Sequence, residues 1–520
     1  MAAVDAPDCA RGGFGETALP RASAKPPYLR GVRFHRAYVF VHNPPMPHLD
    51  SRSAEVLWQD QDAREDLLRR VVTERLAANP APRMDDYVVA TYFFALRTTQ
   101  LTDAAEEISY LATSGVHNPP PGSLLDQCSA KPAGVDAFDA TGRLGLAHVA
   151  IPLKMLQHPD GHVTSCDLLH TIAGAGIFDL YERQDARLVA LQVPERILRT
   201  FPGPAYGPKG VRAMTGFAPD QPAFGTILKP TAGIVPEEVE FLVEEAAQCP
   251  LFLFVKEDED LYPDLDYSPV RERARRAMAA IDRARDKRGG LGLIFAPHIT
   301  GSPHEILDTV HAVLECGVRG VMFSETFACG TVRMVREATR RLPNPPAVYG
   351  HNAGIGTRTR AIWREVIDLL ARLDGIDFRQ TAPLKEGTPF LRPYGEEWRA
   401  SESTLTAPIP GINPTMIVRA GGLDQGNIGI NLADVEARGI EENILFLAGS
   451  AINSIVDGAG KPNPRLGAQA MLEAIDVHRT GELRGAPAAE HVPALAAIAD
   501  RRGLRALREA LRQRYPRVAP

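Results

Sequence analysis

Eight short apolar runs, spaced through residues 224–448, constrain the fold of this chain more than any other feature. The runs are Phe224–Leu228, Leu251–Val255, Leu291–Ala296, Gly320–Phe323, Ala347–Gly350, Ile376–Phe378, Met416–Ala420 and Ile444–Ala448. Stretches with a helical pattern separate most of them, and strands that alternate with helices favour parallel βαβ units. The sequence therefore predicts a (β/α)8 TIM barrel. An open doubly wound sheet, which usually has fewer strands, is the less favoured alternative.

One of the intervening helices is marked at both ends. Ser302 is a candidate N-cap, Pro303 occupies the first helical position, and Glu305 completes a capping box. Apolar residues at helical spacing follow, and Gly317 ends the pattern. Similar signals predict one helix that begins at Pro236 and another over residues 357–373.

The other parts of the chain have a different texture. Residues 1–84 are dominated by Pro, Ala, Arg and Gly, and we expect an irregular extension in which Asp62–Ala78 is the only helix. Residues 85–205 mix strand and helix patterns and predict a small α+β domain of ferredoxin-like type. The barrel is assigned to residues 206–480 and a helical tail to residues 481–520.

The composition excludes several classes of protein. A formal net charge of −6 argues against a nucleic-acid partner and against a basic membrane-binding surface. The six cysteines form no C-x-x-C pairs, which favours reduced thiols in a cytosolic protein. No secretory signal is evident, and no apolar stretch approaches the about 20 residues that a membrane span needs. We therefore expect a cytoplasmic protein with no nucleic-acid or membrane partner.

The most informative polar residues, Lys256, Asp258 and Glu259, follow the second apolar run. In such barrels the carboxyl ends of the strands carry the active site. A lysine at the end of a buried strand is costly unless its charge is paired or removed. Adjacent acids repel one another unless a cation intervenes, and Mg²⁺ prefers such oxygen ligands. Taken alone, the segment is more often a solvated acidic loop than a metal site.

Glycine pairs follow the last two runs, at Gly421-Gly422 and Gly449-Ser450. Barrels often bind a phosphate on backbone N–H groups after strands seven and eight, although turn glycines explain such pairs equally well. Lys229 follows the first run, and a lysine before a proline there is expected to point into the mouth of the barrel. His351 follows the fifth run and His298 the third, but a lone histidine is more often structural.

In these residues the chain resembles the large subunit of ribulose-1,5-bisphosphate carboxylase/oxygenase (rubisco). Residues 225–230, with Gly233 beyond, are similar to the family motif G-x-x-x-K-P-K-x-G-L, and residues 254–259 are similar to its metal motif F-x-K-x-D-E. His351 matches the histidine of the fifth strand, and the two glycine pairs resemble the phosphate loops. The resemblance extends, more weakly, back to about Asp85.

The resemblance implies a role for each matched residue. Lys256 would react with CO2 to form a carbamate, which would bind Mg²⁺ together with Asp258 and Glu259, and the ion would stabilise an enolate of the substrate. Lys229 would act as an acid, a base or an electrostatic aid, His351 would contact the substrate or carry a proton, and Lys385 is the candidate for the lysine of the mobile sixth loop. The residues implied for one substrate phosphate are Gly421, Gly422, Gly449 and Ser450. Because relatives share active sites between subunits, a homodimer or a larger homo-oligomer is implied.

Several positions depart from the pattern of true carboxylases. Thr231 replaces the second lysine of the first-strand motif, Asn352 replaces the arginine that holds the second phosphate, and Ala175 replaces an asparagine used in gas addition. Residues 110–115 also lack the acid and the Thr-Trp pair expected nearby. The chain is therefore most similar to rubisco-like proteins of the form IV type.

Four functions remain open at this point. The first is an enolase or isomerase that acts on a phosphorylated keto sugar or keto compound. The second is a transcarboxylase or hydrolase that cleaves a 3-oxo-acid phosphate. A genuine ribulose-bisphosphate carboxylase and a non-catalytic binding scaffold are the remaining alternatives.

Overall fold

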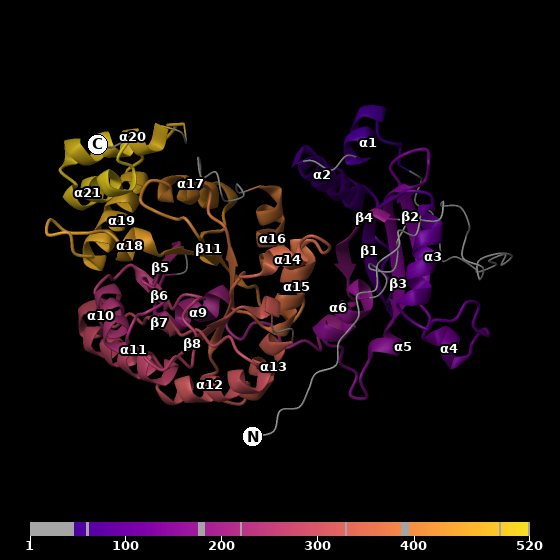
Figure 1. Ribbon diagram of the computed structural model, residues 1–520, viewed down its shortest axis with the longest axis horizontal. Coiled ribbons are helices and arrows are strands. Elements are labelled where there is room, and N and C mark those ends of the chain that lie inside the picture. The colour runs from indigo at the N-terminus through magenta and orange to yellow at the C-terminus, as the bar shows by residue number, and fades with distance from the viewer. Residues whose placement is uncertain are drawn as a thin grey trace, which may run out of the picture. The chain divides into compact units, whose positions relative to one another are not determined.

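The computed structural model describes residues 46–58, 62–174, 183–218, 221–327, 330–385, 395–487 and 490–517 (Figure 1). The chain divides into two units, residues 1–37 and residues 38–520, and every described residue belongs to the second. That unit contains a four-stranded sheet and an eight-stranded sheet. Among the described helices, none has the length and apolar character needed to cross a membrane.

The four-stranded sheet is antiparallel and has the order β2-β3-β1-β4. Its strands are β1 (Tyr87–Leu96), β2 (Lys131–Ala137), β3 (Leu144–Pro152) and β4 (Arg183–Gln192). The helices associated with it are α1 (Ser51–Trp58), α2 (Asp62–Ala78), α3 (Leu101–Leu111), α4 (Leu124–Gln127), α5 (Leu153–Leu156), α6 (Ser165–Ala173) and α8 (Glu195–Leu198). Strand β1 is buried on both faces because α3 and α6 pack against one face and α1 and α2 against the other. The predicted α+β domain is confirmed.

The first described residues are more ordered than the sequence suggested. The prediction that Asp62–Ala78 would be the only helix before residue 84 was wrong, although that helix has the predicted bounds. Helix α1 precedes it, and its Leu57 is fully buried against the β-sheet. The backbone N–H of Ser53 donates to the Asp50 carboxylate at 2.9 Å, so Asp50 caps the helix. Residues 1–45 lie outside the described residues.

The eight-stranded sheet is a parallel barrel, as predicted. Its strands are β5 (Ala223–Ile227), β6 (Phe252–Lys256), β7 (Ile294–Ala296), β8 (Gly320–Phe323), β9 (Ala347–Gly350), β10 (Phe378–Thr381), β11 (Met416–Ala420) and β12 (Ile444–Ala448). The order is β7-β6-β5-β12-β11-β10-β9-β8, and a parallel bridge between His298 and Met322 links the two ends of this order. Six of the eight strands lie within two residues of the predicted runs at both ends, and the exceptions are a shorter β7 and a β10 that continues to Thr381.

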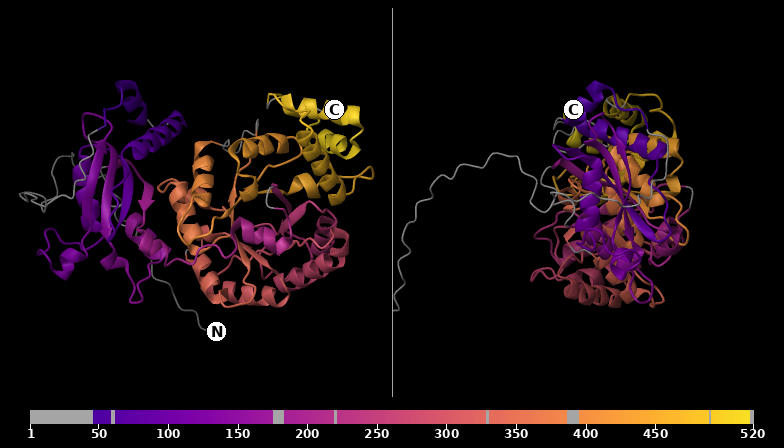
Figure 2. Two further views of the ribbon diagram at one scale, coloured as in Figure 1. Left: turned by 180° about the vertical axis from the view of Figure 1, so that it is seen from behind. Right: turned by 90° about the vertical axis from the view of Figure 1, so that its right-hand side faces the viewer.

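Helices surround these strands in the views of Figures 1 and 2. They are α9 (Gly207–Thr215), α10 (Pro236–Ala247), α11 (Val270–Ala284), α12 (Pro303–Glu315), α13 (Thr331–Thr339), α14 (Ile355–Arg358), α15 (Arg364–Asp374), α16 (Glu396–Thr406), α17 (Ile428–Arg438), α18 (Ser450–Asn453), α19 (Pro464–Arg479), α20 (His491–Arg502) and α21 (Arg505–Arg514). The short 3-10 helices are Asp286–Arg288, Glu325–Phe327 and Glu441–Asn443. Helix α12 has the capping box predicted from Ser302 and Glu305.

The predicted helix over residues 357–373 is instead two helices, α14 and α15. The link between them is extended, because Ile362 forms a parallel bridge with Leu188 of β4. The Leu188 N–H donates to Ala361 O at 2.8 Å, and the Trp363 N–H donates to Leu188 O at 2.8 Å. This pairing joins the barrel to the four-stranded sheet and interrupts the helix.

Candidate active site

Lys256 is the last residue of β6, and its side chain is fully buried. Its Nζ donates to the backbone O of Glu257 at 3.0 Å and lies 3.6 Å from Oε2 of Glu259. Burial lowers the pKa of Lys256, and the Glu259 and Asp258 carboxylates oppose that shift. A lowered pKa increases the fraction of neutral amine, which is the form that reacts with CO2.

A second lysine meets the same loop from the neighbouring strand. Strand β5 pairs with β6 in parallel, with Ile227 opposite Lys256, so that Lys229 is carried to the same end of the barrel. Its Nζ lies 2.6 Å from Oδ2 of Asp258 and donates to the Thr231 hydroxyl at 3.3 Å. Thr231 therefore contributes a neutral hydroxyl where the rubisco motif has a second cation.

His351 completes the cluster from β9. Its Nε2 lies 3.2 Å from Oε2 of Glu259, while the Ala353 N–H donates to its Nδ1 at 3.0 Å. Because Nδ1 accepts this bond, the neutral ring carries its proton on Nε2. Burial, reinforced by the nearby charge of Lys256, holds the pKa of His351 well below its ordinary value. Glu259 thus joins the predicted lysine and the predicted histidine.

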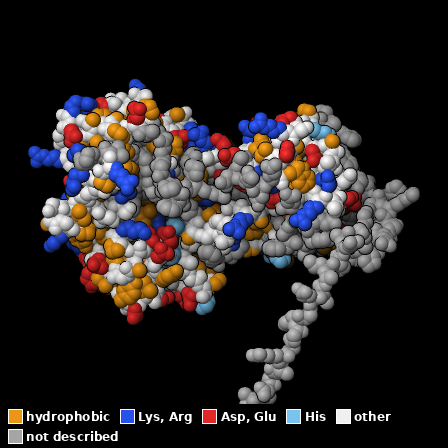
Figure 3. Space-filling view, turned by 45° about the horizontal axis from the view of Figure 1, so that its top comes forward, with side chains coloured by type: hydrophobic (Ala, Val, Ile, Leu, Met, Phe, Trp, Pro, Cys, Tyr) orange, Lys and Arg blue, Asp and Glu red, His pale blue; other side chains and the backbone are white. Residues whose placement is uncertain are grey.

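Glu257 faces away from the cluster. Its carboxylate is fully buried and forms a two-point ion pair with Arg273 of α11, at 2.7 and 3.0 Å. It also accepts the backbone N–H of His298 at 2.9 Å. This pair anchors the loop after β6 and leaves Asp258 and Glu259 as the carboxylates available for a ligand. Figure 3 shows acidic, basic and histidine side chains meeting at one place on the barrel.

His298 has a structural environment. Its Nδ1 lies 3.0 Å from Leu261 O, and its Nε2 lies 2.5 Å from the Thr300 hydroxyl. Both ring nitrogens are therefore engaged within the protein.

A chain of neutral hydrogen bonds lies beside His351. The Tyr349 hydroxyl donates to Oε1 of Gln380 at 2.7 Å, and Nε2 of Gln380 donates to Oδ1 of Asn352 at 3.0 Å. Tyr349 is fully buried, and its ring lies 5.7 Å from Lys256 Nζ. Asn352 was identified from the sequence, but Tyr349 and Gln380 were missed, because Tyr349 lies within an apolar run and Gln380 lies beyond the end of one. The signal that could have revealed them is a polar side chain at the carboxyl end of each of two neighbouring strands, β9 and β10.

The glycine pair after β11 has an unusual backbone. Gly421 and Gly422 have φ values of 89° and 93°, a left-handed conformation that favours glycine. Lys385 packs on this segment, because its Nζ donates to Gly421 O at 3.1 Å and a Cβ on Gly422 would lie 3.3 Å from Lys385 Cδ. Burial lowers the pKa of Lys385. The structure therefore places Lys385 against the candidate phosphate loop.

The second glycine segment approaches the first strand. A Cβ on Gly449 would lie 3.7 Å from Cγ of Lys229, and its backbone O accepts a hydrogen bond from Asn453 at 3.1 Å. Ser450 is exposed at the start of the short helix α18. Of the two segments, the second thus lies beside the lysine that contacts Asp258. Ala175 lies outside the described residues.

The donor set for Mg²⁺ comprises two carboxylates and, once modified, Lys256. Among the described residues, no three His, Cys, Asp or Glu side chains are arranged so that they could hold a metal ion. Asp258 and Glu259 supply two of the hard oxygen donors that Mg²⁺ needs. A carbamate on Lys256 would replace the ammonium beside Glu259 with a further anionic oxygen donor. The chemistry of the three residues is consistent with this arrangement.

These features define a parallel β/α-barrel protein with a lysine–carboxylate cluster at the carboxyl ends of its strands. Residues 217–498 match the family model for the ribulose bisphosphate carboxylase large chain, catalytic domain. This match covers more than half of the chain, and the chain belongs to that family.

Two curated relatives illustrate the range of the family. The chain is 34% identical over 219 residues to a 3-oxo-isoapionate-4-phosphate transcarboxylase/hydrolase of Xanthobacter autotrophicus, an alignment that covers 41% of this chain and 50% of that protein. The chain thus spans only half the length of this relative. It is 26% identical over 424 residues to the ribulose bisphosphate carboxylase of Archaeoglobus fulgidus, which covers 76% of this chain and 89% of that protein.

Solved structures share the fold. An octameric rubisco from Pyrococcus horikoshii superposes with a TM-score of 0.68 at 22% identity, covering 83% of this chain and 94% of that one. A rubisco-like protein (MtnW) from Alicyclobacillus acidocaldarius gives a TM-score of 0.67 at 24% identity, covering 83% and 100%. At these identities the comparison establishes the arrangement of the strands and helices, and nothing about the substrate.

Proposed function

We propose that this protein is a magnesium-dependent enzyme that forms an enolate from a keto compound carrying one phosphate, as an enolase or isomerase. The observation that carries the proposal is the fully buried Lys256, whose pKa burial lowers, beside the carboxylates of Asp258 and Glu259. A scaffold protein gains nothing from burying a lysine in this way, whereas a carbamate-forming site requires one.

Each residue of the cluster has a task in this proposal. Lys256, as its carbamate, and the carboxylates of Asp258 and Glu259 would hold Mg²⁺, and the bound ion would polarise the substrate carbonyl. Lys229 is placed to hold or transfer a proton at its Nζ, since Asp258 keeps it in position at 2.6 Å. His351 presents its Nε2–H at the same place, oriented by the Ala353 N–H. The phosphate is assigned to the glycine segments, with Lys385 beside them.

In this proposal the end of the substrate that lies away from the phosphate faces uncharged side chains. Asn352, Gln380 and Tyr349 form a hydrogen-bonded chain without a cation, so these three residues offer a second phosphate no charged partner. This arrangement supports a substrate with one phosphate and argues against ribulose bisphosphate. By analogy with the family, we also propose that the protein assembles as a homodimer or a larger homo-oligomer.

Cleavage of a 3-oxo-acid phosphate is the second candidate. The relative of highest identity named above is a transcarboxylase/hydrolase, and a 3-oxo-isoapionate-4-phosphate decarboxylase of Rhizobium rhizogenes is 28% identical over 225 residues. Loss or transfer of a carboxyl group from a 3-oxo acid leaves an enolate, so the same cluster serves both reactions.

Deuterium exchange separates the two. The protein is preincubated with bicarbonate and Mg²⁺ and then mixed in D2O with phosphorylated keto sugars and 3-oxo-acid phosphates. Deuterium at the carbon beside the carbonyl, with the carbon skeleton intact, supports the enolase or isomerase, whereas release or transfer of a carboxyl group supports the second candidate. Label from CO2 retained stably in a product acid contradicts both.

The matched variants are Lys256→Ala and Lys287→Ala, because Lys287 is an exposed lysine of a surface 3-10 helix. Lys256→Ala should lose bicarbonate-dependent Mg²⁺ binding and turnover, and Lys287→Ala should keep both. A Lys256→Ala protein that binds Mg²⁺ and turns over like the parent would refute the carbamate site.

A further inference from the structure

A cavity of about 630 Å³ lies among α17, the end of α19, residues 481–486 and His491. None of its lining residues belongs to the candidate active site. Its volume lies in the range of roughly 300–1,000 Å³ that is typical of small-molecule sites. The polar residues that line it are Glu436, His478, Arg479, Arg484 and His491.

One residue that lines this cavity, His491, has a buried nitrogen without a partner among the described residues. His491 is 8% exposed, and its Nε2 lies 3.0 Å from the backbone O of Ala486, so Nε2 is the protonated nitrogen. Its Nδ1 is buried and has no hydrogen-bond partner among the described residues. Buried polar atoms in folded proteins are nearly always paired, so this nitrogen indicates a missing ligand or water.

A second imidazole lies near the first, beside Gly429. A Cβ placed on Gly429 of α17 would lie 3.7 Å from Nδ1 of His491 and 3.9 Å from Nδ1 of His478. The other nitrogen of His478, Nε2, lies 3.0 Å from the carboxylate of Glu436. The acid of the cavity is therefore already engaged by a histidine, and the Nδ1 atoms of both histidines lie near Gly429.

The remaining charges of the cavity are positive. Arg479 and Arg484 both line it, and neither has an ion pair in the described part of the chain. The nearest acid in sequence, Glu482, is paired with Arg501 and Arg502. Guanidinium groups match the geometry of phosphate oxygens, and imidazole serves a phosphate in either state, as an acceptor from P–OH or, once protonated, as a donor to P–O⁻.

We propose that this cavity is a second ligand site, separate from the active site, which binds a small phosphate-bearing anion between Arg479, Arg484 and His491. The arginines supply the charge, and the buried Nδ1 of His491 fixes the orientation of the ligand. The proposal does not depend on the reaction assigned to the barrel, because it uses none of the same residues.

The test uses the full-length protein, freed of divalent metal, and inorganic pyrophosphate as the probe in a calorimetric titration. The double variant Arg479→Ser/Arg484→Ser should bind pyrophosphate at this site at least tenfold more weakly. The matched control is Arg340→Ser/Arg341→Ser, which removes the same charge from two exposed arginines outside the cavity and should bind as the parent does. Equal weakening in both double variants, or in neither, contradicts the proposal.

A crystal soaked in tungstate locates the anion directly, because its anomalous signal is strong. A peak between His491 and the two arginines is expected in the parent and absent in the Arg479→Ser/Arg484→Ser variant. Tungstate found only at the glycine segments after β11 and β12 would overturn the inference, while leaving the proposed phosphate site of the barrel intact. An adventitious ion only is the conclusion if the peak persists unchanged in that variant.

Discussion

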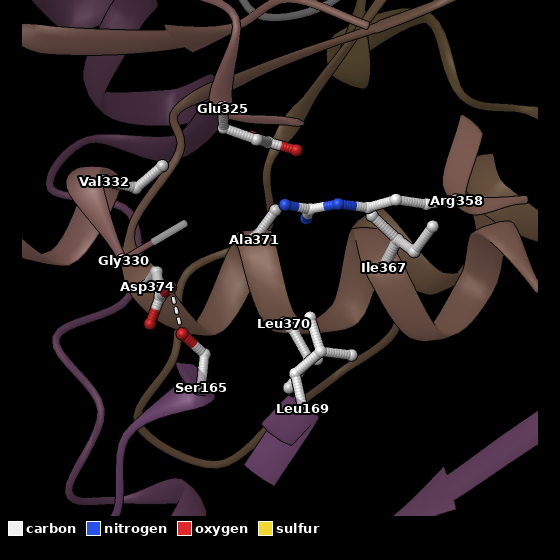
Figure 4. A pocket seen from close by; sticks show the side chains of 10 residues that line it. All are labelled: Ser165, Leu169, Glu325, Gly330, Val332, Arg358, Ile367, Leu370, Ala371 and Asp374. Atoms are coloured by element: carbon white, nitrogen blue, oxygen red, sulfur yellow. Dashed lines mark hydrogen bonds between the residues drawn. The ribbon is translucent and has the colours of Figure 1, made fainter. Parts of the chain in front are cut away.

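Replacing Asp374 with Asn should stabilise the folded protein above neutral pH. Asp374 ends α15, is 5% exposed, and accepts a hydrogen bond from the Ser165 hydroxyl of α6. Figure 4 shows the two side chains at the edge of a small cavity of about 40 Å³. The other carboxylate oxygen, Oδ1, has no partner among the described residues. Burial raises the pKa of Asp374 to about 7, although the Ser165 hydrogen bond and the charge of Arg333 oppose this shift.

The sign and size of the effect follow from this pKa. The folded state holds the proton more tightly than the unfolded state, in which the carboxyl titrates near its ordinary 3.8. As the pH rises, the unfolded chain loses its proton first, so stability is full below about pH 4 and falls until about pH 7. Three pKa units at about 1.4 kcal/mol each give a loss of about 4 kcal/mol. Asn is a neutral side chain of the same shape and does not titrate, so the variant avoids this loss.

Equilibrium urea unfolding at pH 5, 6, 7 and 8 provides the measurement. The free energy of unfolding of Asp374→Asn minus that of the parent should rise steadily with pH and level off above about pH 7. The control is Asp286→Asn, an exposed acid whose replacement should give a flat difference. Ser165→Ala should extend the loss in the parent background to higher pH, because it removes a group that lowers the pKa of Asp374. A difference between Asp374→Asn and the parent that does not vary between pH 5 and pH 8 would refute the reasoning.

Three further perturbations test other parts of the fold. Burial lowers the pKa of His148 to about 4, so the unfolded chain takes up a proton near pH 6.5, before the folded state does. The free energy of unfolding should therefore fall by about 3 kcal/mol as the pH falls from 6.5 to 4. Urea titrations of the parent measure this loss, and His148→Asn should lack it. Arg273→Met leaves Glu257 buried without its ion-pair partner and should lower the free energy of unfolding by about 3–5 kcal/mol in chemical denaturation. Adding Glu257→Leu to the same chain should restore part of this loss. Gly225→Ala would place a Cβ 2.1 Å from the backbone O of Phe254 on the adjacent strand and should lower the thermal midpoint by several degrees; an unchanged midpoint would show that the barrel yields at this position.

The sequence by itself determined much of the barrel, because its signals are local. Apolar runs of three to six residues, most of them separated by helical stretches, identified all eight strands, and the capping residues Ser302 and Glu305 identified the start of α12. The order of Lys229, Lys256 and His351 along the chain was enough to place them at one end of the barrel, because successive parallel strands all present their carboxyl ends there.

Other features depend on contacts between segments that lie far apart in the chain. The break between α14 and α15 arises because Ile362 pairs with Leu188, a residue of the other sheet, and no local pattern around Ile362 reveals that partner. Helix α1 was missed for a related reason: it is short, and it is stable because Leu57 packs against the sheet.

The candidate site also combines features that the sequence revealed with features that depend on contacts between distant segments. The sequence identified which residues carry charge, but only the tertiary structure showed that Glu257 turns away to Arg273 while Glu259 turns inward to Lys256 and His351. These acids are separated by two positions along the chain, and each is directed by a partner contributed from elsewhere in the fold. Residue type is written in the sequence, whereas the direction and environment of a side chain are set by the packing of distant strands and helices around it.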